Sequence, residues 1–264
     1  MNILEQIIDH KQTEVKERSE LYPIKLLERS IFYKAQPVSL TKYIQRSDLS
    51  GIIAEFKRKS PSKGMINEYA KPETVCLKYM RAGASALSVL TDSEYFGGSN
   101  DDLTCARKYN YCPILRKDFI VSEYQIFEAR SIGADAILLI AEVLTDKELK
   151  EFSSLAYSLG MEVLFEIHDK ESILKLPAET RIVGINSRNL KDFSVNIEHS
   201  PNLFKHLPKD VIKIAESGVD SPEMLIKLKK EGFNGFLIGE RFMRDPNPGK
   251  ACEQFITRVK ELQS

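Results

Sequence analysis

The stretch that decides the fold spans residues 51–64 and reads Gly-Ile-Ile-Ala-Glu-Phe-Lys-Arg-Lys-Ser-Pro-Ser-Lys-Gly. Its apolar start predicts a buried β-strand, and the side chains of a strand alternate between two faces, so Glu55 and Lys57 share one face. Ser60 and Pro61 are expected to end the strand, because proline cannot donate to a hydrogen-bond ladder. The stretch predicts a carboxylate and an ammonium side by side at the C-terminal end of an apolar strand. Taken alone, it fits an edge strand with a solvated charged end equally well.

From residue 51 onward, short apolar runs alternate with amphipathic stretches of helical length. Strands are predicted at 51–56, 86–90, 113–117, 136–140, 162–167, 182–186, 211–216 and 235–238. Helices are predicted at 72–82, 100–109, 122–132, 146–159, 169–176, 198–206, 221–231 and 248–262. Eight strand-then-helix units with nearly all-apolar strands predict an α/β protein, a closed (β/α)8 TIM barrel. A doubly wound open sheet is the alternative, but no Gly-x-Gly-x-x-Gly fingerprint follows any strand.

Two helices are predicted ahead of the first strand. Residues 3–18 carry apolar side chains at helical spacing, and Pro23 can open a second short helix. We interpret residues 1–34 as an N-terminal helical extension that packs on the barrel. Because no linker or composition break divides the chain, residues 1–264 are predicted to form a single domain.

Charge and cysteine content narrow the classes of function. Lysines plus arginines number 38, as do aspartates plus glutamates, which argues against a nucleic-acid or membrane-surface binder driven by bulk charge. The four cysteines and four histidines match no zinc or haem spacing, so no metal is expected. No signal peptide and no apolar span are visible, and we expect a cytoplasmic protein with reduced thiols.

The predicted strand ends share one feature: at least six of the eight finish in a charged or amide side chain. In a barrel these ends meet at one mouth, where the chemistry of this fold takes place. The side chains concerned are Glu55 and Lys57, Lys117, Glu166, Asn186 with Arg188, Glu216, and Glu240. The fourth strand instead ends apolar, which suggests that Leu138 or Ile140 forms part of an apolar wall. Any one charged end could be solvated or structural, but their joint occurrence indicates an active site.

Glycines follow the last two strands, at Gly218 and Gly239. In (β/α)8 barrels the loops after strands seven and eight often bind phosphate, because glycine lets backbone N–H groups approach it closely. The pair therefore predicts a phosphate site, although each glycine alone also suits an ordinary tight turn.

These motifs resemble indole-3-glycerol phosphate synthase of tryptophan biosynthesis. The resemblance covers essentially the whole chain, including the N-terminal helices. It is carried by residues 53–64, 87–92 with 95–99, 115–120, 134–140, 165–169, 184–190, 215–219 and 237–240. Such a protein would close a ring without a cofactor, converting 1-(2-carboxyphenylamino)-1-deoxyribulose 5-phosphate to indole-3-glycerol phosphate, carbon dioxide and water.

The resemblance also implies roles for single residues. Lys117 would be the general acid that protonates the substrate carbonyl oxygen, while Lys57 would pair with the substrate carboxylate and assist a later protonation. Glu166 would stabilise developing positive charge or act as a base, with Glu55 a further acid/base group. Asn186 would hydrogen-bond the reacting part, and the expected substrate-binding residues are Lys59, Ser60, Phe96, Phe119, Leu138, Arg188, Ser217, Gly218, Gly239 and Glu240. Glu240 would contribute its backbone to the phosphate cradle, with its carboxylate pointing away.

Two other functions remain open at this stage. The chain could be another sugar-phosphate barrel enzyme, such as a phosphoribosyl isomerase, or a barrel that binds a phosphate ligand without turnover. In each case the expected partner is a small anionic sugar phosphate, with no nucleic acid, no membrane and no cofactor. The chain is expected to be a monomer.

Overall fold

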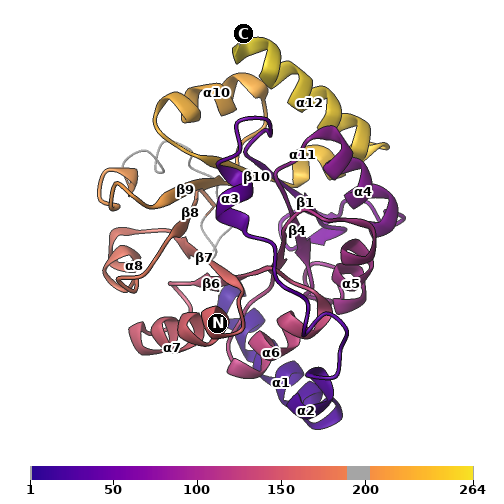
Figure 1. The fold of residues 1–264 in the computed structure, drawn as a ribbon, viewed down its shortest axis with the longest axis vertical. Helices are drawn as coiled ribbons and strands as arrows, with labels where there is room; N and C mark the ends of the chain where they lie inside the picture. Colours follow the sequence, from indigo (N-terminus) through magenta and orange to yellow (C-terminus); the bar gives the residue numbers. More distant parts are fainter. Residues whose placement is uncertain (1, 189–202, 264) are drawn as a thin grey trace.

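The computed structural model describes residues 2–188 and 203–263, and its centre is a closed barrel of parallel strands (Figure 1). The strands follow the order β1-β10-β9-β8-β7-β6-β5-β4 around the barrel. They are β1 (Ile52–Phe56), β4 (Ala86–Leu90), β5 (Ile114–Lys117), β6 (Ala136–Ile140), β7 (Glu162–Ile167), β8 (Ile182–Asn186), β9 (Ile212–Glu216) and β10 (Gly235–Ile238). The predicted (β/α)8 barrel is therefore confirmed.

Helices surround the barrel, and most begin and end where the sequence predicts (Figure 1). They are α1 (Ile3–Leu21), α2 (Ile24–Leu27), α3 (Leu40–Ile44), α4 (Pro72–Ala82), α5 (Asn100–Tyr109), α6 (Glu123–Ile132), α7 (Asp146–Ser158), α8 (Lys170–Leu174), α10 (Pro222–Lys230), α11 (Glu240–Met243) and α12 (Pro248–Gln263). Helix α4 starts with Pro72 and ends at Gly83 in the left-handed conformation that suits glycine. Most of the helix predicted at 198–206 lies outside the described residues.

The end of the first strand differs from the prediction. Strand β1 stops at Phe56, and a separate strand β2 (Lys59–Ser60) pairs antiparallel with β3 (Gly64–Met65). The chain therefore leaves the barrel before Ser60, since Ser60 already pairs with Gly64 of the neighbouring short strand. Pro61 lies in the turn of this hairpin and does not end the barrel strand.

Two apolar clusters fill the barrel and its surroundings. Side chains that alternate outward from the strands pack against the helices, while those that alternate inward fill the barrel, as with Ile53, Leu115 and Leu164. The inward cluster continues into α3 through Leu40 and Ile44. The barrel interior is therefore a packed core below its mouth.

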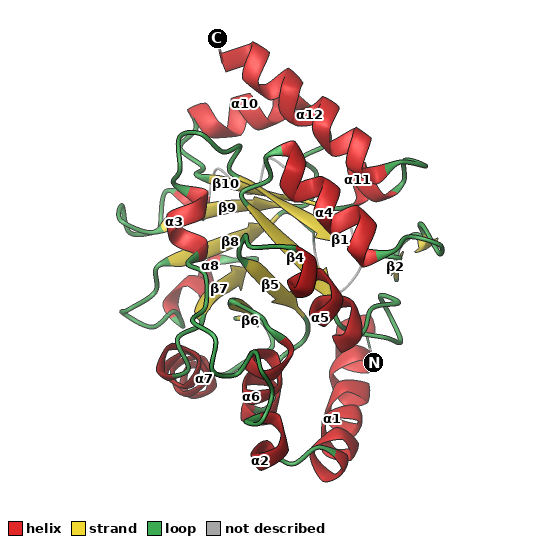
Figure 2. Cartoon of the chain, turned by 45° about the vertical axis from the view of Figure 1, so that its right-hand side comes forward, coloured by secondary structure: helices red, strands yellow, loops and turns green. Residues whose placement is uncertain are grey.

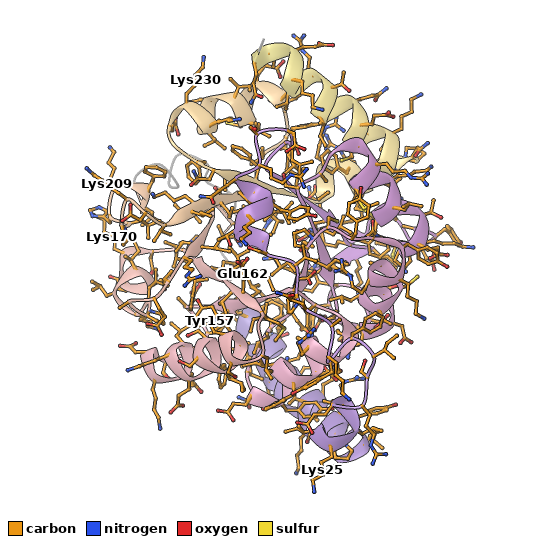
Figure 3. The ribbon with its side chains drawn as sticks, viewed as in Figure 1. Lys25, Tyr157, Glu162, Lys170, Lys209 and Lys230 are labelled. Carbon is orange, nitrogen blue, oxygen red and sulfur yellow. The ribbon has the colours of Figure 1, made fainter. Side chains whose placement is uncertain are left out.

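Helices α3 and α1 lie on opposite sides of the barrel (Figure 2). Helix α3, which the sequence did not predict, is held by Glu162 at the start of β7: the carboxylate accepts hydrogen bonds from Ser39 Oγ and Thr41 N, both at 2.8 Å (Figure 3). Helix α1 contributes Leu4 and Ile7 to the inward cluster at the other end. Helix α3 therefore covers one end of the barrel, and the site is at the other end.

In the described part of the chain, helices fall short of the length and apolar character that crossing a membrane requires.

Candidate active site

A cavity opens at the C-terminal ends of the barrel strands, and we name it the central cavity. Most of the predicted site residues line it, although they come from all eight barrel strands or the loops that follow them. These are Glu55, Lys57, Ser60, Phe96, Lys117, Phe119, Leu138, Glu166, Asn186, Arg188, Ser217 and Glu240. Residues separated by up to 185 positions in sequence therefore meet at one mouth, as the closure of the barrel requires.

Lys117, the last residue of β5, lies between two carboxylates. Its Nζ donates to Glu166 Oε2 of β7 at 2.7 Å and to Glu216 Oε2 of β9 at 2.9 Å. The other oxygen of Glu166 accepts a hydrogen bond from Asn186 Nδ2 at 3.1 Å. All four side chains belong to barrel strands, so their positions are fixed by the sheet.

Glu55 and Lys57 form a second charged pair in the same cavity. Glu55 Oε1 and Lys57 Nζ are 2.8 Å apart, which confirms that the two side chains share one face of the chain. Gly239 makes room for this pair, because a Cβ at that position would lie 2.4 Å from Glu55 Oε1. The pair places the Lys57 ammonium at the mouth, and this ammonium balances the charge of the buried Glu55 carboxylate.

One wall of the central cavity is apolar. The rings of Phe96 and Phe119 have centroids 6.0 Å apart, and Leu138 and Ile140 of β6 line the cavity with them. The wall is positioned by Asp92, whose Oδ1 accepts the backbone N–H groups of Tyr95 at 2.7 Å and of Phe96 at 3.2 Å. The predicted apolar end of the fourth strand thus lies where a planar ring could pack.

A second cavity adjoins the first, and we name it the rim cavity. It is lined by Glu55, Lys57, Ser62, Lys63, Arg188, Ser217, Gly218, Val219, Asp220, Leu237, Ile238, Gly239, Glu240, Arg241 and Arg244. Ser217 and Gly218 have φ values of 64° and 77°, a left-handed turn directly after β9. Gly239 is the residue before the short helix α11. Backbone N–H groups and five cationic side chains therefore surround this cavity. These features favour an anion.

Two predicted residues are placed differently. Lys59 lines neither cavity; its Nζ donates to the backbone oxygen of Glu94 at 2.7 Å, because the β2–β3 pairing turns Ser60 inward and Lys59 outward. The Glu240 carboxylate was expected to point away from the mouth. Instead, its Oε2 lies 3.6 Å from Arg188 Nη2, and Glu240 lines both cavities.

Comparison with protein families matches residues 4–255 of this chain to "Indole-3-glycerol phosphate synthase". A curated protein of that name from Bacteroides thetaiotaomicron is 44% identical over 259 residues, which cover 98% of this chain and 99% of the relative. The chain belongs to the indole-3-glycerol phosphate synthase family. As a member, it is a carboxy-lyase of tryptophan biosynthesis.

Other comparisons agree with this placement. An indole-3-glycerol phosphate synthase from Carboxydothermus hydrogenoformans is 41% identical over 262 residues, covering 96% of this chain and 99% of the relative. Among solved structures, a chain of the tryptophan synthase complex from Pyrococcus furiosus matches with a TM-score of 0.58. The match covers 81% of this chain and 99% of the chain from that complex. At 15% sequence identity, this second likeness shows the barrel fold alone.

In this member of the indole-3-glycerol phosphate synthase family, burial and charge act against each other at Lys117. Burial alone would lower the pKa of Lys117, but the nearby carboxylates of Glu166, Glu216 and Glu55 outweigh it and raise the pKa above its ordinary value. Burial would raise the pKa of Glu166, yet Lys117 and Asn186 hold it below the ordinary range. Burial raises the pKa of Glu216 to about 8. The site therefore holds a protonated lysine between one ionised carboxylate and one carboxyl that is neutral at pH 7.

Sequence reasoning noted Glu216 at a strand end but did not include it among the candidate residues. Its contact with Lys117 depends on the closure of the barrel, which brings β9 opposite β5 across the mouth. Its position could have identified it. Glu216 is the last residue of β9, and Glu166 is the second-last residue of β7, so both carboxylates lie at the C-terminal end of a strand.

The raised pKa of Glu216 gives protein stability a pH dependence with a definite sign. Its ordinary value is 4.5 and burial raises it to about 8, so the folded state binds this proton more tightly than the unfolded state. The resulting stabilisation is complete below the ordinary pKa and is lost as the pH rises to the folded value. We expect Glu216→Gln, which cannot ionise, to lose less stability than the parent between about pH 5 and about pH 8 in urea unfolding. Parallel pH curves for the two proteins would contradict the raised pKa.

Proposed function

We propose that this chain closes the indole ring of 1-(2-carboxyphenylamino)-1-deoxyribulose 5-phosphate, with Lys117 as the general acid. The products are indole-3-glycerol phosphate, carbon dioxide and water. The observation that carries the proposal is the position of the Lys117 ammonium, which is held between Glu166 and Glu216 at the edge of the central cavity.

The hydrogen bonds of Lys117 hold its ammonium in one position, as a general acid requires. An ammonium has three N–H donors, and the two carboxylates accept two of them, which leaves one for a substrate oxygen. Proton transfer from this N–H to the carbonyl oxygen would neutralise the charge that develops as the aromatic carbon attacks. Glu166 remains beside the reacting carbon to stabilise the positive charge of the intermediate or to accept its proton. Asn186 orients Glu166 for that task.

Two anion sites would hold the substrate at its two ends. The rim cavity, with Ser217, Gly218, Gly239 and the backbone of Glu240, takes the phosphate, in the position that phosphate sites occupy in (β/α)8 barrels. Lys57 lies between the rim cavity and the central cavity and takes the substrate carboxylate. Arg188 also lines both cavities and strengthens the attraction for a doubly anionic molecule.

The apolar wall would hold the aromatic ring of the substrate. Phe96, Phe119 and Leu138 present a surface on which the carboxyphenyl ring can pack. With the ring and the phosphate both anchored, the flexible chain between them must fold over Lys117, which favours a near-attack geometry. Loss of the carboxylate is also easier where one side of the site is apolar.

A fluorescence assay tests the proposal directly. We expect purified protein mixed with the carboxyphenylamino sugar phosphate to produce the fluorescence of an indole at a rate proportional to protein concentration. Members of this family bear the name of this activity, which supports the choice of substrate. Absence of indole product with a folded, active-site-intact protein would contradict the proposal.

The same assay separates the two alternatives. A phosphoribosyl isomerase would turn over the preceding sugar phosphate and leave the carboxyphenylamino compound unchanged. A non-catalytic barrel would bind the compound without forming an indole. We expect turnover of the carboxyphenylamino compound alone, because Lys117 and Glu166 meet in the central cavity.

A further inference from the structure

Gly184 lies in the middle of β8, between two carboxylates of the site. Its neighbours Val183 and Ile185 pack in the outer apolar cluster, so position 184 faces the barrel interior. In the register of the sheet Gly184 is the partner of Glu166 on β7, and β9 with Glu216 runs along its other side. The strand therefore carries no side chain at the level where the charged groups meet.

A side chain at this position would take the place of the Glu216 carboxylate. A Cβ built on Gly184 would lie 1.9 Å from Glu216 Oε1 and 3.0 Å from its Cδ, while the next nearest atom, Leu164 Cδ1, is 3.4 Å away. Such a Cβ and the Glu216 carboxylate exclude each other. The backbone does not explain the glycine, because Gly184 is not among the residues with positive φ.

We propose that Gly184 is a positioning residue: its missing side chain is the space in which the Glu216 carboxylate sits against Lys117. The proposal rests on the proposed function, in which Lys117 acts as the acid. Glu216 Oε2 contacts Lys117 at 2.9 Å, and Oε1 is the atom that points at Gly184. A similar arrangement recurs after β10, two strands along the barrel, where the missing Cβ of Gly239 makes room for Glu55.

Gly184→Ala tests this inference because the collision is with the end of a flexible side chain. The protein can accommodate the new methyl by turning the Glu216 carboxylate away, so we expect the barrel to stay folded. The contact between Glu216 and Lys117 is then lost. We expect kcat to fall about 100-fold, as for a displacement of about 1 Å in a catalytic group. KM should change much less, because Lys57 and the rim cavity are not touched.

Gly235→Ala is the matched control. Gly235 also faces the barrel interior from a strand, and a Cβ there would meet the end of a flexible side chain, Ile214 Cδ1, at 2.6 Å. It lies far from the carboxylates, at the start of β10 beside Ile44 of α3. We expect Gly235→Ala to keep the kcat of the parent, with a cost confined to thermal stability.

A double-mutant cycle with Glu216→Ala separates a positioning role from a purely structural one. Glu216→Ala removes the atoms that the methyl of Gly184→Ala would strike, so in that background Gly184→Ala should lower kcat by less than about twofold. The free energy of unfolding in urea gives a second comparison that does not depend on enzyme activity. Gly184→Ala should lower this free energy by less when residue 216 is already alanine.

These experiments distinguish a failure of the inference about Gly184 from a failure of the proposed function. If the parent produces no indole, the proposed function fails, and the cycle on unfolding still tests whether Gly184 seats Glu216. If the parent is active and Gly184→Ala has the kcat of the parent, the inference is overturned. An equal fold-loss of kcat in both backgrounds, or an equal loss of stability in both, would overturn it as well.

Discussion

Lys117→Ala is expected to lower kcat for indole formation by about 1,000-fold, within the range that general acids contribute. The ammonium that it removes forms ion pairs with both Glu166 and Glu216, at 2.7 Å and 2.9 Å. Without it, the substrate carbonyl would lose the proposed proton donor, and the buried carboxylate of Glu166 would lose the cation beside it.

Two controls make this result specific. Circular dichroism should show that the variant keeps the barrel, since Lys117 lies at the end of β5 and not within the packed core. Lys230→Ala removes a lysine from the exposed end of α10 and should leave kcat unchanged (Figure 3). If Lys117→Ala turned over substrate at the rate of the parent, Lys117 would not be the acid.

Lys11→Met is expected to have the largest effect on stability, about 3–5 kcal/mol, as for other buried ion pairs that lose one partner. Lys11 of α1 is fully buried, and its Nζ lies 2.8 Å from Glu14, 2.9 Å from Asp92 and 3.1 Å from Asp118. Burial lowers the pKa of Lys11, but these three carboxylates outweigh it and raise the pKa above the ordinary value. Methionine fills a similar volume but takes the Lys11 ammonium away from buried Asp92, whereas Asp118 keeps its ion pair with Arg116 at 3.1 Å.

Urea unfolding at neutral pH measures this loss. Lys16→Met, on an exposed position of the same helix, should change the free energy of unfolding by less than about 0.5 kcal/mol. Adding Asp92→Asn to Lys11→Met should recover part of the loss, because one unpaired charge is then removed. A loss for Lys11→Met no larger than that for Lys16→Met would show that the buried cluster does not hold α1 to the barrel.

The sequence predicted the barrel well because each strand carries a local signal. The runs at 86–90, 136–140 and 162–167 are mostly apolar, and the structure has strands with the same bounds. The pairing of Glu55 with Lys57 was also predictable, since alternation along a strand needs no knowledge of the rest of the fold.

What sequence missed depends on contacts between distant segments. Helix α3 has five residues, too few for a helical period to be recognised, and Glu162 holds it from the start of β7. Lys11 lies on the same helical face as Ile7 and Val15, so its burial could have been suspected, but its aspartate partners are more than 80 residues away. The outward turn of Lys59 depends on the β2–β3 pairing.

Other expectations stay predictions. The single domain, the monomer and the cytoplasmic location follow from the sequence analysis, and the roles of single site residues remain part of the proposed function. Some residues of the resembling motif at 184–190 lie outside the described part of the chain, namely 189 and 190.

A single-turnover experiment with protein in excess over the carboxyphenylamino sugar phosphate tests the central claim most directly. Indole formation and carbon dioxide release would be followed together, for the parent and for Lys117→Ala. We predict one indole-3-glycerol phosphate and one carbon dioxide per substrate with the parent, and neither product on the same timescale with the variant. Binding of substrate by the parent without either product, or equal product from both proteins, would contradict an enzyme that closes the ring by proton transfer from Lys117.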